Sequence, residues 1–189
     1  MSKALLVLLG VLFSISVLFN VAQYKVLEKC IEDKLHTKSQ DKQKEILKEF
    51  IQMHNSRIGK GYSDYLAAVY IKAGKEFNIN PFLLVSLSKP ESNFNHRAVS
   101  YMGARGIMQV MPFWTNHIDF LKTPDDLHDP EINIRAGAYI LRLYTDQCGP
   151  GEAAIRCYHG GPRAVHAPRP ETVTHSQNVM RIYNSFISI

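Results

Sequence analysis

The chain has 189 residues, a formal net charge of +5 and an apolar fraction of 46%. This length is typical of one domain of ordinary size with a short extension, and the composition excludes collagen, coiled coil and disorder for the chain as a whole. The three cysteines are too few for a fold built on disulfides. The basic side chains are scattered and form no nucleic-acid motif, so no nucleic-acid partner is expected.

Residues 4–22 carry no charged side chain and would span about 28 Å as a helix, close to the hydrocarbon thickness of a bilayer. This length favours a retained membrane anchor over residues 1–23. A cleaved signal segment is the alternative, although Asn20 would then stand at a position that prefers a small residue. The chain would be membrane-anchored in the first case and secreted in the second.

The lysines around this apolar run bear on its orientation. Lys3 precedes the run, whereas Lys25, Lys29, Lys34 and Lys38 follow it. The positive-inside rule alone would place the rest of the chain in the cytoplasm. An anchor and a signal segment both otherwise suit export, so we expect the following domain in the periplasm or facing the cell wall.

Residues 24–60 are predicted to form a helical stalk or linker. Apolar residues recur at helical spacing from Tyr24 to Leu35, are absent from residues 36–45 and resume at Ile46. A short coiled-coil dimer is the alternative, but the apolar seam breaks after about two heptads.

Residues 61–189 are predicted to form a mainly α-helical domain. Ser63 is a candidate N-cap for a first helix, and Asn80-Pro81 and Asp129-Pro130 each place a capping residue before a proline at the first helical position. The helix from Pro130 is expected to run to about Cys148. Further helices are predicted over residues 152–159 and 171–187, and the sequence shows no alternation typical of strands.

Glu91 stands at the end of the helix that begins at Pro81. From Ser92 to Ile118 the sequence has no other carboxylate but many aromatic and methionine side chains. Apolar surroundings favour the protonated form of a carboxyl, as a general acid for glycosidic cleavage requires. An exposed glutamate at a helix end is the plainer alternative.

A series of short motifs favours the interpretation of Glu91 as a general acid over that of an exposed glutamate. They are Asn80-Pro81, Glu91-Ser92-Asn93-Phe94, Ala98-Val99-Ser100, Gly103-Ala104, Gly106-Ile107-Met108-Gln109, Met111-Pro112, Asp129-Pro130 with Asn133-Ile134 and Ala136-Gly137, and Tyr158-His159-Gly160-Gly161-Pro162. In order and spacing they resemble the soluble-lytic-transglycosylase type of peptidoglycan lyase, within the lysozyme-like superfamily. The resemblance runs from about Leu66 to Tyr183 and implies an all-α lysozyme-like domain.

The resemblance implies that Glu91 acts as acid and then as base. The MurNAc–GlcNAc bond would break without water, and a 1,6-anhydro ring would close on the muramic sugar. Substrate-binding positions carried over from the family are Ser92, Ser100, Met108, Gln109, Tyr158 and His159.

The chain departs from the family pattern at three positions. Pro90 precedes Glu91, Ile107 replaces leucine, and His159 replaces asparagine. Two alternatives therefore stay open. One is a goose-type muramidase, whose second carboxylate would be Asp119, Asp125 or Asp126. The other is a non-catalytic wall-binding module.

The sequence contains no zinc-ligand motif and no phosphate-binding loop, so neither a metal nor a cofactor is expected. Cys148 and Cys157 fit a disulfide in an oxidising compartment and two buried thiols equally well. Cys30 is left over and could pair between chains. The expected partners are peptidoglycan glycan strands and the membrane, with bacterial wall turnover, an envelope-spanning secretion system or a phage assembly as settings.

Overall fold

The computed structural model describes residues 25, 28–30, 32, 34, 35 and 37–187, which divide into a unit up to Gln43 and a second unit from Lys44. The predicted membrane segment, residues 1–23, lies outside these residues. Within the described part, no helix is both long and apolar enough to span a bilayer. In the first unit the described residues are helical, and Cys30 is exposed and unpaired.

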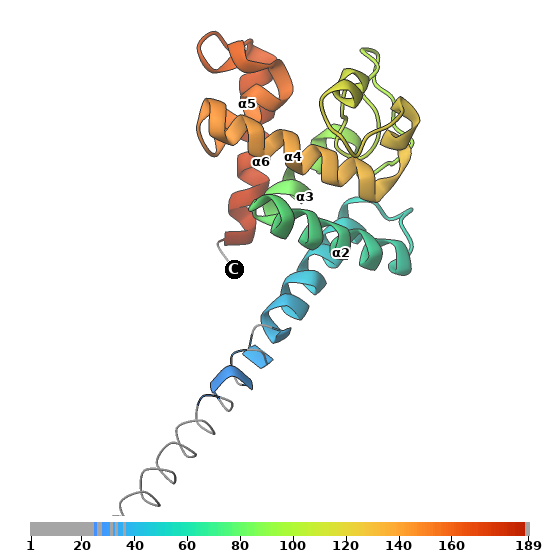
Figure 1. The fold of residues 1–189 in the computed structure, drawn as a ribbon, viewed down its shortest axis with the longest axis vertical. Coiled ribbons are helices and arrows are strands. Elements are labelled where there is room, and N and C mark those ends of the chain that lie inside the picture. Colours follow the sequence, from blue (N-terminus) through green and yellow to red (C-terminus); the bar gives the residue numbers. More distant parts are fainter. Residues whose placement is uncertain (1–24, 26–27, 31, 33, 36, 188–189) are drawn as a thin grey trace, which may run out of the picture. The chain divides into compact units, whose positions relative to one another are not determined.

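The second unit is an assembly of helices joined by loops and short 3-10 turns (Figure 1). The prediction of a mainly α-helical domain is confirmed for the described residues, whose β pairing is confined to isolated bridges around Arg105. After the helical residues 44–54, the elements are α2 (Lys60–Phe77), α3 (Pro81–Ser92), η1 (Pro112–Asn116), η2 (Pro124–His128), α4 (Pro130–Cys148), α5 (Glu152–Gly160), η3 (Pro162–Val165) and α6 (Pro170–Ile187).

The predicted starts of α3 and α4 are confirmed. The Asn80 side chain accepts from the backbone N–H of Phe82 over 2.9 Å, and the Asp129 side chain accepts from Ile132 over 2.9 Å. Each cap satisfies a donor that the first helical turn leaves free. The predicted cap at Ser63 is wrong, because α2 begins three residues earlier. The buried Ser63 hydroxyl instead accepts from the Gln52 side chain.

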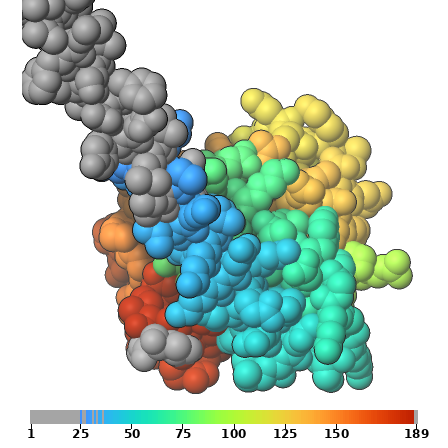
Figure 2. Space-filling model, turned by 90° about the horizontal axis from the view of Figure 1, so that it is seen from below, coloured from blue at the N-terminus to red at the C-terminus, as the bar shows by residue number. Residues whose placement is uncertain are grey.

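Helical residues 44–54 contribute to the core of the second unit. Leu47 and Ile51, which fall within the segment predicted to be a stalk, are fully buried. The Phe50 ring lies 4.8 Å from the Phe186 ring, centroid to centroid. Figure 2 shows this neighbourhood from outside, with the red side chains at the end of α6 beside the blue ones of residues 44–54. The N-terminal helix of this unit therefore covers the α3–α6 side of the core.

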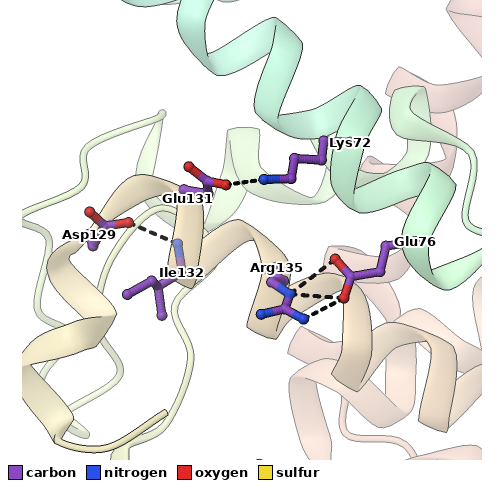
Figure 3. A network of polar contacts seen from close by, with 6 residues as sticks. All are labelled: Lys72, Glu76, Asp129, Glu131, Ile132 and Arg135. Carbon is purple, nitrogen blue, oxygen red and sulfur yellow. Dashed lines mark hydrogen bonds and ion pairs between the residues drawn. The ribbon is translucent and has the colours of Figure 1, made fainter. Parts of the chain in front are cut away.

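Polar contacts join α2 to α4 (Figure 3). The Arg135 guanidinium donates to both carboxylate oxygens of Glu76, and Lys72 pairs with Glu131. Arg135 also lies over the Phe120 ring, 4.0 Å from its centroid. Bidentate geometry fixes the relative rotation of two helices better than a single exposed ion pair does. The contacts therefore hold α4 against α2.

Candidate active site

Glu91 lies in the last turn of α3, whose earlier turns bury Leu84, Val85 and Leu87. The helix continues through Pro90 and ends at Asn93, which takes the left-handed conformation with φ 52°. The Glu91 side chain is 12% exposed. The proline thus leaves Glu91 on the helix, with its carboxyl largely enclosed.

Two histidines, from α5 and α6, lie at the Glu91 carboxyl. The His175 Nε2 atom is 3.2 Å from Glu91 Oε1, and the His175 side chain is also 12% exposed. This is ion-pair distance without hydrogen-bond alignment, since among the described residues the buried Nε2 has no hydrogen-bond partner. The His159 ring stacks on the His175 ring at a centroid distance of 4.3 Å.

His159 reaches the surface on its outer side. Its Nδ1 lies 3.3 Å from the hydroxyl of Thr172, a buried residue of α6. Partial burial of the ring, and secondly the neighbouring His175, lower the pKa of His159. His159 therefore stays neutral to a lower pH than a free histidine.

Tyr158 connects α5 to the loop that follows α3. Its hydroxyl donates to the backbone carbonyl of Met108 over 2.8 Å. Burial, and secondly the charge of Glu91, raise the pKa of Tyr158 well above its usual value. The phenol is therefore a permanent donor beside the carboxyl.

The loop over residues 98–110 is held to the helices by side chains that bind its backbone. Ser92 donates its hydroxyl to the carbonyl of Ile107 over 2.7 Å. Asn133 of α4, fully buried, accepts from the backbone N–H of Met108 over 2.8 Å and donates to the carbonyls of Arg105 and Leu127, each over 2.9 Å. Asn133 thus binds three backbone groups, of which the Arg105 carbonyl also accepts from the backbone N–H of Val110.

Gly106 allows this close approach. Its φ is 77°, and a Cβ atom there would lie 2.2 Å from the Leu127 carbonyl oxygen and 2.3 Å from Asn133 Nδ2. A side chain at this position would therefore push the loop away from α4.

The predicted substrate-binding residues fall into two groups. Glu91, Ser92, Tyr158, His159 and the Met108 backbone are connected through the contacts above. The Met108 side chain is fully buried in the position that a Gly137 Cβ atom would occupy, so it contributes packing and no exposed surface.

Ser100 lies near the start of the loop over residues 98–110, and Gln109 lies near its end. Gln109, at φ 48°, donates its side-chain amide to the Gly106 carbonyl over 2.9 Å. The Ser100 hydroxyl accepts from the backbone N–H of Ala104 over 3.0 Å. Both side chains therefore shape the loop itself in this structure.

A cleft of about 560 Å³ opens at the end of α3, lined by residues 54–58 and 92–96 and by Tyr62. Within the described part of the chain, the buried atoms Tyr62 Oη and Asn93 Oδ1 have no hydrogen-bond partner. Burial raises the pKa of Tyr62 to about 12, so its phenol also stays protonated. The cleft thus begins next to Ser92, and these two buried polar atoms lie in its walls.

Two of the three carboxylates considered as partners for Glu91 have other contacts. Asp125 pairs with Arg105 at 2.7 Å, and Asp119 is exposed. Asp126 accepts the backbone N–H groups of Thr123 and Lys122, which lower the pKa of Asp126. Among the described residues, no three His, Cys, Asp or Glu side chains are placed to hold a metal ion.

Cys148 and Cys157 form a disulfide that joins the end of α4 to α5. The bond spans the turn at Gly149 and Gly151, two glycines with positive φ. It therefore ties α5, at the residue before Tyr158 and His159, to the end of α4.

Sequence reasoning missed His175 as a site residue. It lies in a polar stretch of the last helix, and a lone histidine there carries no local signal. Asn133 was noted in a motif without a role. Its three contacts join residues far apart in sequence, so they become visible only once α4 lies against the loop.

Comparison with known proteins agrees with this geometry. The model of the transglycosylase SLT domain family matches residues 68–180. The transglycosylase of Enterobacteria phage PRD1 is 35% identical over 89 residues, which are 47% of this chain and 32% of that protein. The membrane-bound lytic murein transglycosylase C of Actinobacillus pleuropneumoniae serotype 5b is 30% identical over 150 residues, which are 71% of this chain and 41% of that protein.

Solved structures show the same fold. A structure of lytic transglycosylase Slt from Pseudomonas aeruginosa, an inactive mutant, aligns with a TM-score of 0.58 and 24% identity, covering 64% of this chain and 24% of that one. The 70 kDa soluble lytic transglycosylase of Escherichia coli aligns with a TM-score of 0.60 and 21% identity, covering 78% and 30%. The predicted resemblance is thereby confirmed: this chain belongs to the transglycosylase SLT domain family of lytic transglycosylase enzymes.

Proposed function

We propose that this protein cleaves the β-1,4 bond between N-acetylmuramic acid and N-acetylglucosamine in peptidoglycan, leaving a 1,6-anhydro end. The observation that carries the proposal is the Glu91 carboxyl, 12% exposed at the end of α3 and connected to α5 and α6. The names of the two relatives above support the reaction class. The chain spans 32% and 41% of their lengths, so the activity is inferred from the shared domain.

The proposed reaction uses one carboxyl group twice. Glu91 first donates its proton to the glycosidic oxygen, and the bond from that oxygen to muramic C1 breaks. The substrate's acetamido group stabilises the cationic centre at C1. The Glu91 carboxylate then removes the proton from the muramic 6-hydroxyl, whose oxygen forms the new bond to C1. Glu91 recovers its proton, and no water is consumed.

The other residues would hold the glycan and the loop. The protonated phenol of Tyr158 fixes the Met108 carbonyl, and Ser92 fixes that of Ile107. The cleft beyond Ser92 has room for a sugar and is lined by polar residues, among them Asn55, Asn95 and His96. We assign Ser100 and Gln109 to shaping the loop, and His159 to the edge of the site.

A hydrolase acting on the same bond would need a second carboxylate opposite the first. Asp125 and Asp126 are engaged with Arg105 and with backbone N–H groups, which favours the single-carboxyl mechanism over a goose-type muramidase. A wall-binding module without catalysis would bind peptidoglycan and release no fragments.

We further propose that residues 1–23 anchor the chain and that the domain works outside the cytoplasm. The Cys148–Cys157 disulfide is typical of an oxidising compartment, and the Actinobacillus relative is named as membrane-bound. Mild alkali treatment of isolated membranes tests the anchor, since an integral segment stays in the pellet and a peripheral protein is released.

The experiment that tests the activity is mass spectrometry of the soluble products after the full chain digests purified peptidoglycan. Anhydro products, one water molecule lighter than hydrolysis products, support the proposal. Products with reducing ends would indicate the muramidase, and wall binding without products would indicate the non-catalytic module.

A further inference from the structure

His175 contacts the catalytic carboxyl from a helix distant in sequence. It lies in the second turn of α6, and its Nε2 approaches Glu91 Oε1 to 3.2 Å while both side chains are 12% exposed. At this distance the imidazole nitrogen can hold a carboxyl oxygen in place, because little solvent reaches the two groups to compete for the contact. The inference that follows rests on the proposed function of Glu91.

Four other ionisable groups surround this pair. His159 stacks on the His175 ring, and the Tyr158 phenol feels the Glu91 charge. Glu152 pairs with Arg156 on α5 and also accepts from the hydroxyl of Ser176, the residue after His175. The charges of Glu152 and Arg156 thus compensate each other.

Glu171, one turn earlier on α6, is exposed and lies 4.0 Å from Arg169. The Glu171 charge raises the pKa of His159, but this effect is weaker than the lowering by burial and by His175. Among the described groups, Glu91 is therefore the carboxylate at contact distance from the His175 ring.

We propose that His175 is a positioning residue that holds one oxygen of Glu91 and so leaves the other oxygen for proton transfer to and from the glycan. The contact that joins the two side chains runs from Nε2 to Oε1 over 3.2 Å. A carboxyl held by one oxygen cannot rotate freely, and its second oxygen keeps one direction through both proton transfers. Catalytic hydrogen bonds are often poorly aligned before substrate binds, so the present geometry is that of the free enzyme.

Two substitutions in the full chain test this role. His175→Gln keeps an N–H donor near the position of Nε2 without a titrating group, and His175→Leu removes the donor. We expect the leucine variant to lose about 10- to 100-fold in kcat with KM within about twofold, which corresponds to one hydrogen bond to a charged group. The glutamine variant should stay within about threefold of wild type in kcat, because it keeps the donor.

The exposed His166 provides a matched control, because His166→Leu should leave both kcat and KM unchanged. If the leucine variant does not fold, the NMR comparison of wild type with Glu91→Gln decides. A leucine variant with wild-type kcat, or a glutamine variant that loses as much kcat as the leucine variant, would overturn the proposal.

A second measurement does not depend on activity. NMR spectra of the imidazole C–H resonances, with that of His175 assigned by its loss in the glutamine variant, are compared between wild type and Glu91→Gln at one pH. Replacing the carboxyl that contacts Nε2 should change the chemical shift of the His175 resonance. An unchanged resonance overturns the pairing. A changed resonance in a protein that releases no glycan fragments would instead refute the proposed function and leave the pairing intact.

Discussion

The Tyr158 hydroxyl donates to the Met108 carbonyl over 2.8 Å and thereby joins α5 to the loop that follows the catalytic helix. The Met108 backbone N–H is held by Asn133 of α4 over 2.8 Å. Both polar groups of one residue are thus bound by side chains from two helices. The loop beside Glu91 is fixed through this residue.

Tyr158→Phe should lower both stability and activity. The substitution leaves the Met108 carbonyl without its donor, which costs about 1–3 kcal/mol for a buried group. We expect a reduced free energy of unfolding in urea and a lower kcat on peptidoglycan. Tyr65→Phe is the control, because Tyr65 is exposed on α2. Equal behaviour of the two variants would contradict the role of the Tyr158 hydroxyl.

Asn133→Ala should be among the most destabilising polar substitutions in the domain. It removes the side-chain partner of the Met108 N–H and of the Leu127 carbonyl, whereas the Arg105 carbonyl keeps the backbone N–H of Val110. At about 1–3 kcal/mol for each of the two unsatisfied groups, a loss of about 2–6 kcal/mol is expected from chemical denaturation. Asn116→Ala, at an exposed position, should change stability by less than about 0.5 kcal/mol.

Gly106 and Gly103 form a natural matched pair. Both have positive φ, 77° and 86°, but a Cβ atom at Gly106 would clash with Leu127 and Asn133, whereas nothing lies within 4 Å of one at Gly103. Gly103→Ala should cost about 1–2 kcal/mol from backbone strain alone. Gly106→Ala should cost clearly more in the same unfolding assay and should also impair activity. Equal losses would mean that the contact with α4 is unimportant.

His159 should make stability depend on pH below neutrality. Its pKa is lowered in the folded protein, so the unfolded chain binds a proton more readily. This contribution is fully present above the unfolded value of about 6.5 and is lost as the pH falls toward the lowered pKa. We expect the melting temperature of wild type, relative to His159→Asn, to fall between pH 7 and pH 5. His166→Asn is the control, and a difference that is constant with pH would refute the assignment.

Much of the fold follows from local sequence signals. Asn80-Pro81 and Asp129-Pro130 combine a side-chain acceptor with a preset backbone angle, so they locate the starts of α3 and α4 without tertiary information. The N-cap prediction at Ser63 is wrong because serine also occurs in protein cores, and the Ser63 hydroxyl there binds Gln52. The spacing of Leu47 and Ile51 predicts a helix, but it does not predict the surface against which the two side chains are buried.

Part of the site is likewise predictable from local sequence signals. Glu91 could be singled out because the next segment has no other carboxylate, and Tyr158 because its motif resembles the family. The Met108 side chain could not be distinguished as core or surface, since this depends on Gly137 of a helix that packs against it. His175 depends on how α6 crosses the end of α3, which no short pattern encodes.

The most direct test of the central claim compares the full wild-type chain with Glu91→Gln on purified peptidoglycan, with products identified by mass spectrometry. We expect anhydro-muropeptides from wild type and none from the variant. The melting temperature of the variant should be close to that of wild type, because the amide is isosteric with the carboxyl. Anhydro products from Glu91→Gln at the wild-type rate, or products with reducing ends from wild type, would contradict the account.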